Sequence, residues 1–96
     1  MFDITRIEGA FKRNPTAEVI EFVNYNDGGP FGLSSEKREL KILDEVARVL
    51  AQLPNAKTKE GHVTQEGYHI YGQGEYSFNE DSHKYKARVH RPAQNQ

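Results

Sequence analysis

Apolar residues recur at helical spacing near the start of the chain. Within residues 3–14 they stand three or four positions apart, at Ile4, Ile7, Ala10 and Phe11. Asp3 can cap this helix with its carboxylate, and Pro15 ends it because proline lacks a backbone donor and restricts the residue before it. The pattern therefore predicts a short helix over residues 3–14, with a strand over residues 2–7 as the alternative.

A longer helical pattern occupies residues 35–53. Its apolar residues are Leu40, Ile42, Leu43, Val46, Ala47, Val49, Leu50 and Leu53. A serine pair just before it can supply the N-cap oxygen, and Pro54 stops it. The apolar stripe covers about half of the helical circumference, which is more than one sheet face covers. We therefore expect a long amphipathic helix with Leu43 and Leu50 against a sheet and a second element beside it.

Strand patterns appear in two places. Residues 17–25 are rich in β-branched and aromatic side chains on both faces, and the turn-forming run at residues 26–30 follows them. Within residues 68–78 the apolar side chains fall on even positions, and within residues 83–89 they fall on odd positions. A hairpin that turns at residues 79–82 brings both sets to one face.

The turn at residues 79–82 predicts a specific hairpin register. It pairs Phe78 with His83, Tyr76 with Tyr85, Glu75 with Lys86, and Tyr71 with His90. Gly72 and Gly74 lie in the middle of the first strand, where glycine marks a bulge or the close approach of another element. We expect the long helix to be that element.

These elements predict an α+β fold, with a small three-stranded antiparallel sheet. The long amphipathic helix and the shorter N-terminal helix pack on one face of it. The strand at residues 17–25 extends the hairpin. The 96 residues suffice for one domain, which we expect to span residues 1–91 and to be followed by a frayed tail at residues 92–96.

Composition narrows the function classes. Thirteen basic residues stand against fourteen acidic ones, so the net charge is −1 and no whole-chain field favours nucleic acid or lipid. The absence of cysteine excludes disulfides and thiolate chemistry. Neither a membrane-spanning apolar run nor a signal sequence is visible, which favours a cytoplasmic protein without membrane contact.

Two candidate sites have simpler explanations. The glycine-rich loop at residues 28–35 precedes a predicted helix, but its spacing fits no phosphate-binding motif, and turn chemistry explains its residues. The four histidines, His62, His69, His83 and His90, show no metal-ligand spacing. We therefore expect no metal, no cofactor and no catalytic residue.

The polar face of the hairpin is the surface best suited to a partner. It gathers Lys84, Lys86, Arg88 and His90 on one strand and His69, Tyr71, Gln73 and Glu75 on the other. We predict that Tyr71, Lys84, Lys86, Arg88 and His90 bind a macromolecule.

The function that these features favour is that of a small non-enzymatic binding protein. Its partner would be a protein, as for an accessory or inhibitor protein of a phage or mobile element. The alternative is a nucleic-acid-binding or RNA-cleaving module. In it, phosphates contact the basic side chains and nucleobases stack on the tyrosine and histidine rings.

Overall fold

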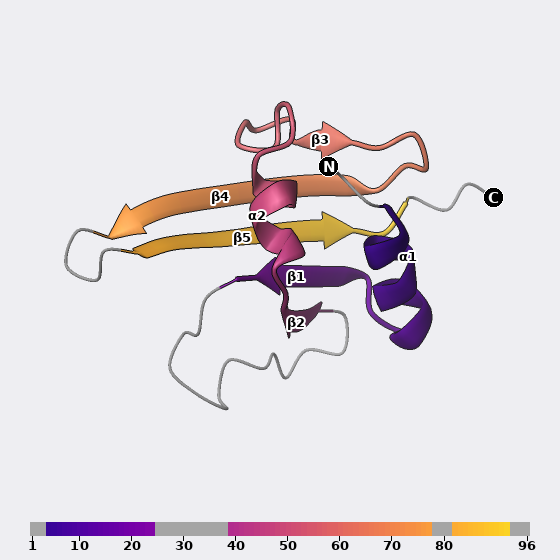
Figure 1. The fold of residues 1–96 in the computed structure, drawn as a ribbon. Helices are drawn as coiled ribbons and strands as arrows, with labels where there is room; N and C mark the ends of the chain where they lie inside the picture. Colours follow the sequence, from indigo (N-terminus) through magenta and orange to yellow (C-terminus); the bar gives the residue numbers. More distant parts are fainter. Residues whose placement is uncertain (1–3, 25–38, 78–81, 93–96) are drawn as a thin grey trace.

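The computed structural model describes residues 4–24, 39–77 and 82–92, with side chains at all of these except 39, 75–77, 82 and 83. The elements are α1 (Ile4–Arg13), β1 (Val19–Val23), β2 (Glu39–Leu43), α2 (Val46–Ala51), β3 (His62–Val63), β4 (His69–Ser77) and β5 (Ser82–His90). In this part of the chain the strands form one five-stranded sheet in the order β2-β1-β5-β4-β3 (Figure 1). The β1–β2 pair is parallel and the other pairs are antiparallel.

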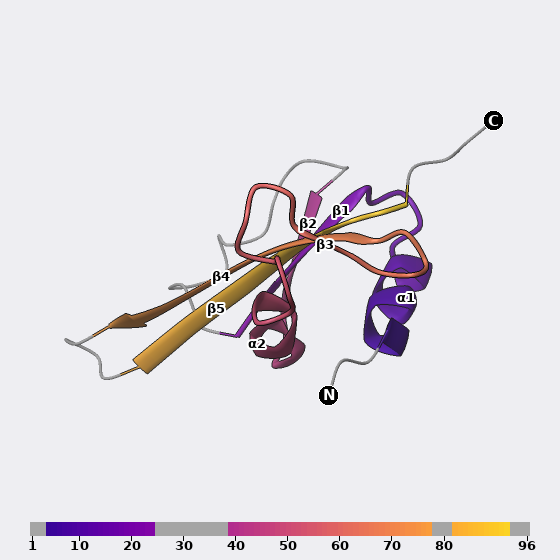
Figure 2. The same ribbon diagram turned by 90° about the horizontal axis from the view of Figure 1, so that it is seen from above.

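Both helices lie on the same face of the sheet, which we call the inner face (Figure 2). The core forms between them and the alternate residues of the central strands. In one row across the sheet, Ile20 pairs with Val89, and Val89 pairs with Ile70; all three are 0% exposed. Helix α1 adds Phe11 and helix α2 adds Leu50, both buried. The burial of these apolar side chains is the main stabilising contribution.

The predicted three-stranded antiparallel sheet under one long helix is wrong. The segment expected to be a single helix contains a strand, β2, and a helix of six residues, α2. Leu40 and Ile42 alternate along β2 and pair with Ile20 and Phe22 of β1. Leu43 points away from this set and is 66% exposed, so its predicted burial is also wrong, whereas Leu50 is buried as predicted.

The error has a physical cause. Apolar residues at positions 40 and 42 fit a strand, and those at 46, 47 and 50 fit a helix, yet all of them fall within one wide arc of a helical projection. The excessive width of that arc was the signal that two elements share the segment. Pairing with β1 decided the outcome, because a parallel partner hydrogen-bonds one side of the backbone of residues 39–43 and the sheet partly buries Leu40 and Ile42.

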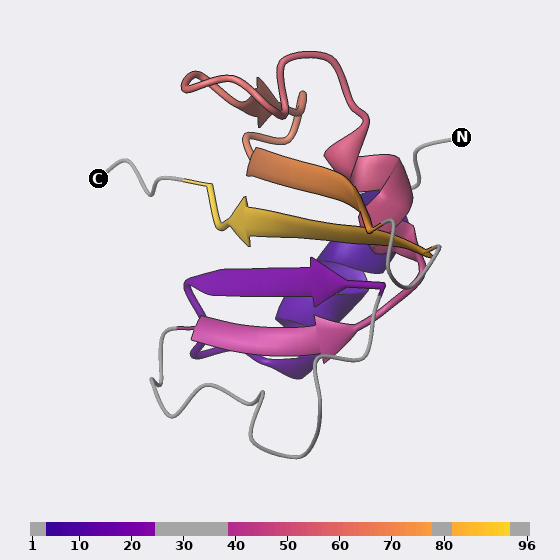
Figure 3. The same cartoon turned by 90° about the vertical axis from the view of Figure 1, so that its left-hand side faces the viewer.

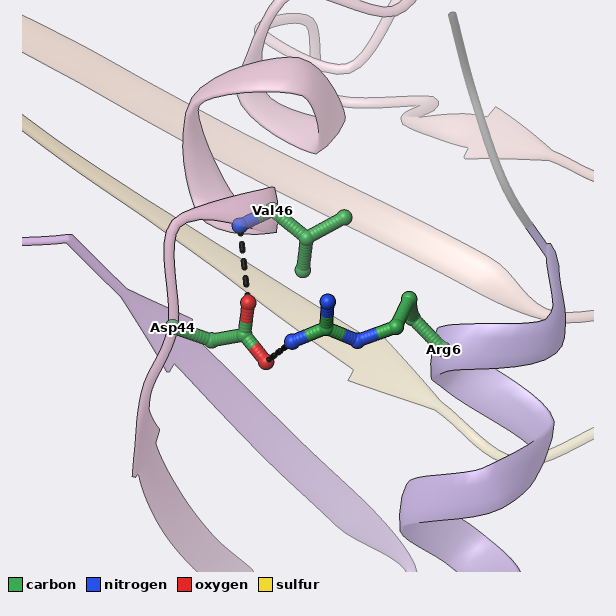
Figure 4. A network of polar contacts seen from close by, with 3 residues as sticks. All are labelled: Arg6, Asp44 and Val46. Carbon is green, nitrogen blue, oxygen red and sulfur yellow. Dashed lines mark hydrogen bonds and ion pairs between the residues drawn. The ribbon is translucent and has the colours of Figure 1, made fainter.

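Asp44 separates the strand from the helix. Its Oδ1 accepts a hydrogen bond of 2.8 Å from the backbone N–H of Val46, one of the donors that the first helical turn leaves unsatisfied. Its Oδ2 forms an ion pair with the Arg6 guanidinium, which reaches across from α1 (Figure 4). One carboxylate thus starts α2 and connects it to α1.

The helix predicted over residues 3–14 is confirmed as α1, and the strand predicted over residues 17–25 is confirmed as β1. Arg91, just after β5, fixes the turn between them. Its guanidinium donates to the carbonyl oxygens of Asn14, Pro15 and Ala17 at 2.7–3.3 Å. It also lies 4.5 Å from the ring centroid of Phe11. With ten and six residues, α1 and α2 are both too short to cross a bilayer.

The hairpin is confirmed, but its register is shifted by two residues. Tyr71 pairs with Arg88 instead of His90, and Tyr76 pairs with His83 instead of Tyr85. Because side chains alternate with a period of two, this shift leaves the residues with described side chains on their predicted faces. The connecting residues 78–81, including Phe78, lie outside the described residues.

The expected close approach of a helix occurs at Gly72. A Cβ atom there would lie 2.5 Å from the Cα of Ala51, so α2 packs directly on the β4 backbone. At Gly74 the neighbour is the ring of Tyr85 from β5, which a Cβ would meet at 2.6 Å. The predicted contact with a helix is therefore correct for Gly72 and wrong for Gly74.

Candidate functional site

The outer face of the sheet, on the side away from both helices, carries the predicted partner-binding residues. Two rows cross its centre. In one row Glu21, Arg88 and Tyr71 are neighbours on β1, β5 and β4. In the next row Lys86 lies beside Gln73. The structure therefore brings three predicted residues together, namely Tyr71, Lys86 and Arg88.

The other two predicted residues lie on the same strand, on either side of this centre. His90 contacts the ring of Tyr71 with a centroid separation of 5.6 Å and an interplanar angle of 86°. Lys84 pairs with Glu75 in the β4–β5 ladder, beyond the end of the β1–β5 pairing. The glycine-rich loop at residues 28–35 and the side chain of His83 lie outside the described residues.

The outer face contains a hollow of about 320 Å³. Strands β1, β5 and β4 form its floor, and the chain between α2 and β3 forms a wall. We call it the outer hollow; its lining residues are Glu21, Ala56, Lys57, Thr58, Tyr71, Gly72, Gln73, Lys86 and Arg88. The chain after α2 reaches this side by passing around the β4 edge of the sheet (Figure 3).

The wall is held against the β4 edge by backbone contacts. The N–H of Gly72 donates to the carbonyl of Ala56 at 2.7 Å, and the side chain of Ala56 is 1% exposed. The chain then turns tightly: the Thr58 hydroxyl donates to the carbonyl of Asn55 at 2.8 Å, and the N–H of Gly61 donates to the carbonyl of Thr58 at 3.2 Å. Lys57 and Thr58 are therefore fixed at the rim of the outer hollow.

Two histidines hold the ends of this wall. The Nδ1 of His62 lies 3.0 Å from the carbonyl oxygen of Pro54, and the Nε2 of His69 bonds to the carbonyl oxygen of Glu60. A carbonyl only accepts, so each of these ring nitrogens carries the proton. The described residues contain no cluster of acidic or histidine side chains able to hold a metal ion.

The ring of Tyr71 is packed among protein groups. It stacks on the ring of His69 with a centroid separation of 4.6 Å and an interplanar angle of 17°. Gly61, with φ of +71°, brings its backbone so close that a Cβ would lie 2.9 Å from this ring. His90 makes a perpendicular contact with the same ring, so His69, Gly61 and His90 all occupy positions around it where a nucleobase would otherwise stack.

The charges in the outer hollow are predominantly positive. Lys57, Lys86 and Arg88 supply three positive charges and Glu21 one negative charge, so the lining carries 3 − 1 = +2. Arg88 lies 3.7 Å from the Glu21 carboxylate, with the two side chains 49% and 15% exposed. Within the described residues, neither lysine takes part in an ion pair or a side-chain hydrogen bond. Their ammonium groups are therefore available to an anion.

Sequence reasoning missed Glu21 and the wall residues, Ala56 to Thr58. The residues of the wall are mostly polar and have no periodicity. Its contact with β4 joins Ala56 and Gly72, which are distant in the chain, so no local pattern marks it. The chain matches no protein-family model, no curated protein and no solved structure, so the chemistry of the site rests on its own residues.

Proposed function

We propose that this chain is a non-enzymatic binding protein whose outer sheet face recognises a protein partner. The observation that carries the proposal is the outer hollow, where Lys57, Lys86 and Arg88 converge from a loop and a strand around one acidic residue, Glu21. Arginine at the centre of a concave patch is typical of binding hot spots. Cations and amide donors held in this way bind anions, whereas acid–base catalysis requires a base oriented by a second polar group beside the substrate.

A protein partner is favoured over nucleic acid for two reasons. The net charge of −1 supplies no long-range attraction to a polyanion. Tyr71, the ring expected to stack on bases, is engaged with His69 and Gly61. A partner that presents one acidic group to the outer hollow requires neither an extended basic track nor a free aromatic platform.

The test begins with capture from a nuclease-treated lysate, followed by affinity measurements with the purified partner. We expect Arg88→Ala to weaken the complex by about 1–3 kcal/mol, as for hot-spot residues, and Lys86→Ala to weaken it in the same direction. Arg48→Ala is the matched control, because Arg48 is exposed on α2, on the opposite side of the sheet.

Two results would contradict this function. If Arg48→Ala and Arg88→Ala weakened the complex equally, the outer face would not be the interface. If the purified protein instead bound polynucleotides with a steep dependence on salt, and Lys86→Ala reduced that dependence, the nucleic-acid alternative would replace it.

A further inference from the structure

The net charge of the outer hollow matches one particular kind of anion. The lining carries +2, from Lys57, Lys86 and Arg88 against Glu21. A phosphate monoester carries about −1.5 to −2 at neutral pH, whereas a carboxylate or a single phosphodiester carries one negative charge. One phosphate monoester would therefore neutralise the lining. A second anionic group would then meet no net positive charge in the lining.

The lining residues that carry hydrogen-bond donors come from three segments of the chain. Lys57 approaches from the wall, Gln73 from β4, and Lys86 and Arg88 from β5. A phosphate monoester has three terminal oxygens at three corners of a tetrahedron, and these accept hydrogen bonds from donors on different sides. A planar carboxylate is better matched by one forked donor. Donors distributed over three segments thus favour phosphate.

The size of the outer hollow indicates how the phosphate is carried. At about 320 Å³ it lies at the small end of the range of ligand pockets, about 300–1,000 Å³. This volume accepts a phosphate and the side chain that bears it, but not a run of nucleotides. We propose that the outer hollow takes a phosphorylated side chain of the protein partner, an inference that rests on the binding function proposed above.

The experiment uses the purified chain and NMR titration of its backbone amides. The probes are a blocked phosphoserine, the matching blocked aspartate, inorganic phosphate and a uridine oligonucleotide. We expect phosphoserine to shift the amides of Gly72, Gln73 and Lys86, with an affinity about tenfold or more above that of aspartate, because the phosphate carries more negative charge and one more acceptor oxygen than the carboxylate. Inorganic phosphate should shift the same amides more weakly.

Variants assign the interaction to the outer hollow. Lys57→Ala and Lys86→Ala should each weaken phosphoserine binding about tenfold. Lys12→Ala, an exposed lysine of α1, should leave it unchanged. Glu21→Gln should strengthen binding, because it removes the only negative charge of the lining. The amide spectrum of each variant also reports whether it is folded.

Four outcomes would overturn the inference. Equal affinity for aspartate and phosphoserine would show that only charge is recognised. Inorganic phosphate binding as tightly as phosphoserine would indicate free phosphate as the ligand. Tighter binding of the oligonucleotide, weakened by Lys86→Ala, would indicate nucleic acid. If dephosphorylation of the captured partner left an Arg88-dependent complex intact, the phosphate inference would fail while the proposed function would stand.

Discussion

The two faces of the central strands differ in what they require of their residues. On the inner face Ile20, Val89 and Ile70 are 0% exposed beneath the helices. The neighbouring row across the same strands lies on the outer face, at the outer hollow. It consists of Glu21 on β1, Arg88 on β5 and Tyr71 on β4. The inner row depends on shape and volume, whereas the outer row depends on charge. Substitutions on the inner face should therefore reduce stability, and those on the outer face should reduce binding.

The largest effect is expected on the inner face, at Leu50. Leu50 is 0% exposed, so Leu50→Ala removes buried apolar atoms and leaves a cavity. We expect a loss of about 2–5 kcal/mol in the free energy of unfolding, measured by urea denaturation. The control Arg48→Ala, on the exposed side of the same helix, should change it by no more than about 0.5 kcal/mol. A loss below about 1 kcal/mol at Leu50 would mean that α2 is not part of the core.

A second inner-face effect is expected from one added methyl group. Gly72→Ala would place a Cβ 2.5 Å from the Cα of Ala51, and a backbone atom cannot rotate away. We expect destabilisation of about 1–3 kcal/mol, as for other overpacked sites. Gly9→Ala in α1 is the matched control: its Cβ meets only the end of the Arg13 side chain, at 3.4 Å. That variant should stabilise the helix by up to about 1 kcal/mol, and equal losses at both glycines would disprove the close contact of α2 with β4.

On the outer face the expected effect on stability is smaller. The Glu21–Arg88 pair is partly exposed and its groups lie 3.7 Å apart, so Glu21→Gln should change the free energy of unfolding by less than about 1 kcal/mol. Thermal denaturation of this variant and of Arg88→Ala checks this value. A loss as large as that of Leu50→Ala would mean that the outer row also stabilises the fold.

The smallest effect concerns Tyr68, whose ring stacks on that of Phe11 at 5.5 Å. Burial, and then the charge of Glu8, raise the pKa of the Tyr68 hydroxyl above its usual value, while Arg91 opposes the shift. The pKa of this hydroxyl in the folded state thus exceeds its pKa in the unfolded chain, which is about 10. The stabilisation that goes with the raised pKa is complete below about pH 10 and is lost as the pH rises through the folded-state pKa. Unfolding midpoints between about pH 8 and pH 11 should fall less for Tyr68→Phe than for the unsubstituted chain; parallel curves would refute the shift.

The sequence pattern determined the elements whose segments carry the signals of a single kind of secondary structure. Helix α1 and the hairpin of β4 and β5 were predicted from the spacing of apolar residues, because that spacing decides which residues share a face. Strand β1, which buries residues on both faces, was predicted from its β-branched and aromatic side chains. Alternation cannot distinguish two registers that differ by two residues, because both bury the same side chains. The faces of Tyr71 and Arg88 were therefore predictable, but their direct pairing was not.

The tertiary structure decided the rest. Residues 39–51 satisfy a helical projection, and only the availability of β1 as a parallel partner divides them into β2 and α2. The packing of α2 on Gly72 places the chain that follows it, and so brings Ala56 to the edge of β4 and Lys57 to the outer face. The basic residues of β5 are visible in the sequence because they alternate along one strand. The outer hollow is not visible in the sequence, because contacts between residues distant in the chain join its wall to its floor. Local patterns do not encode such contacts.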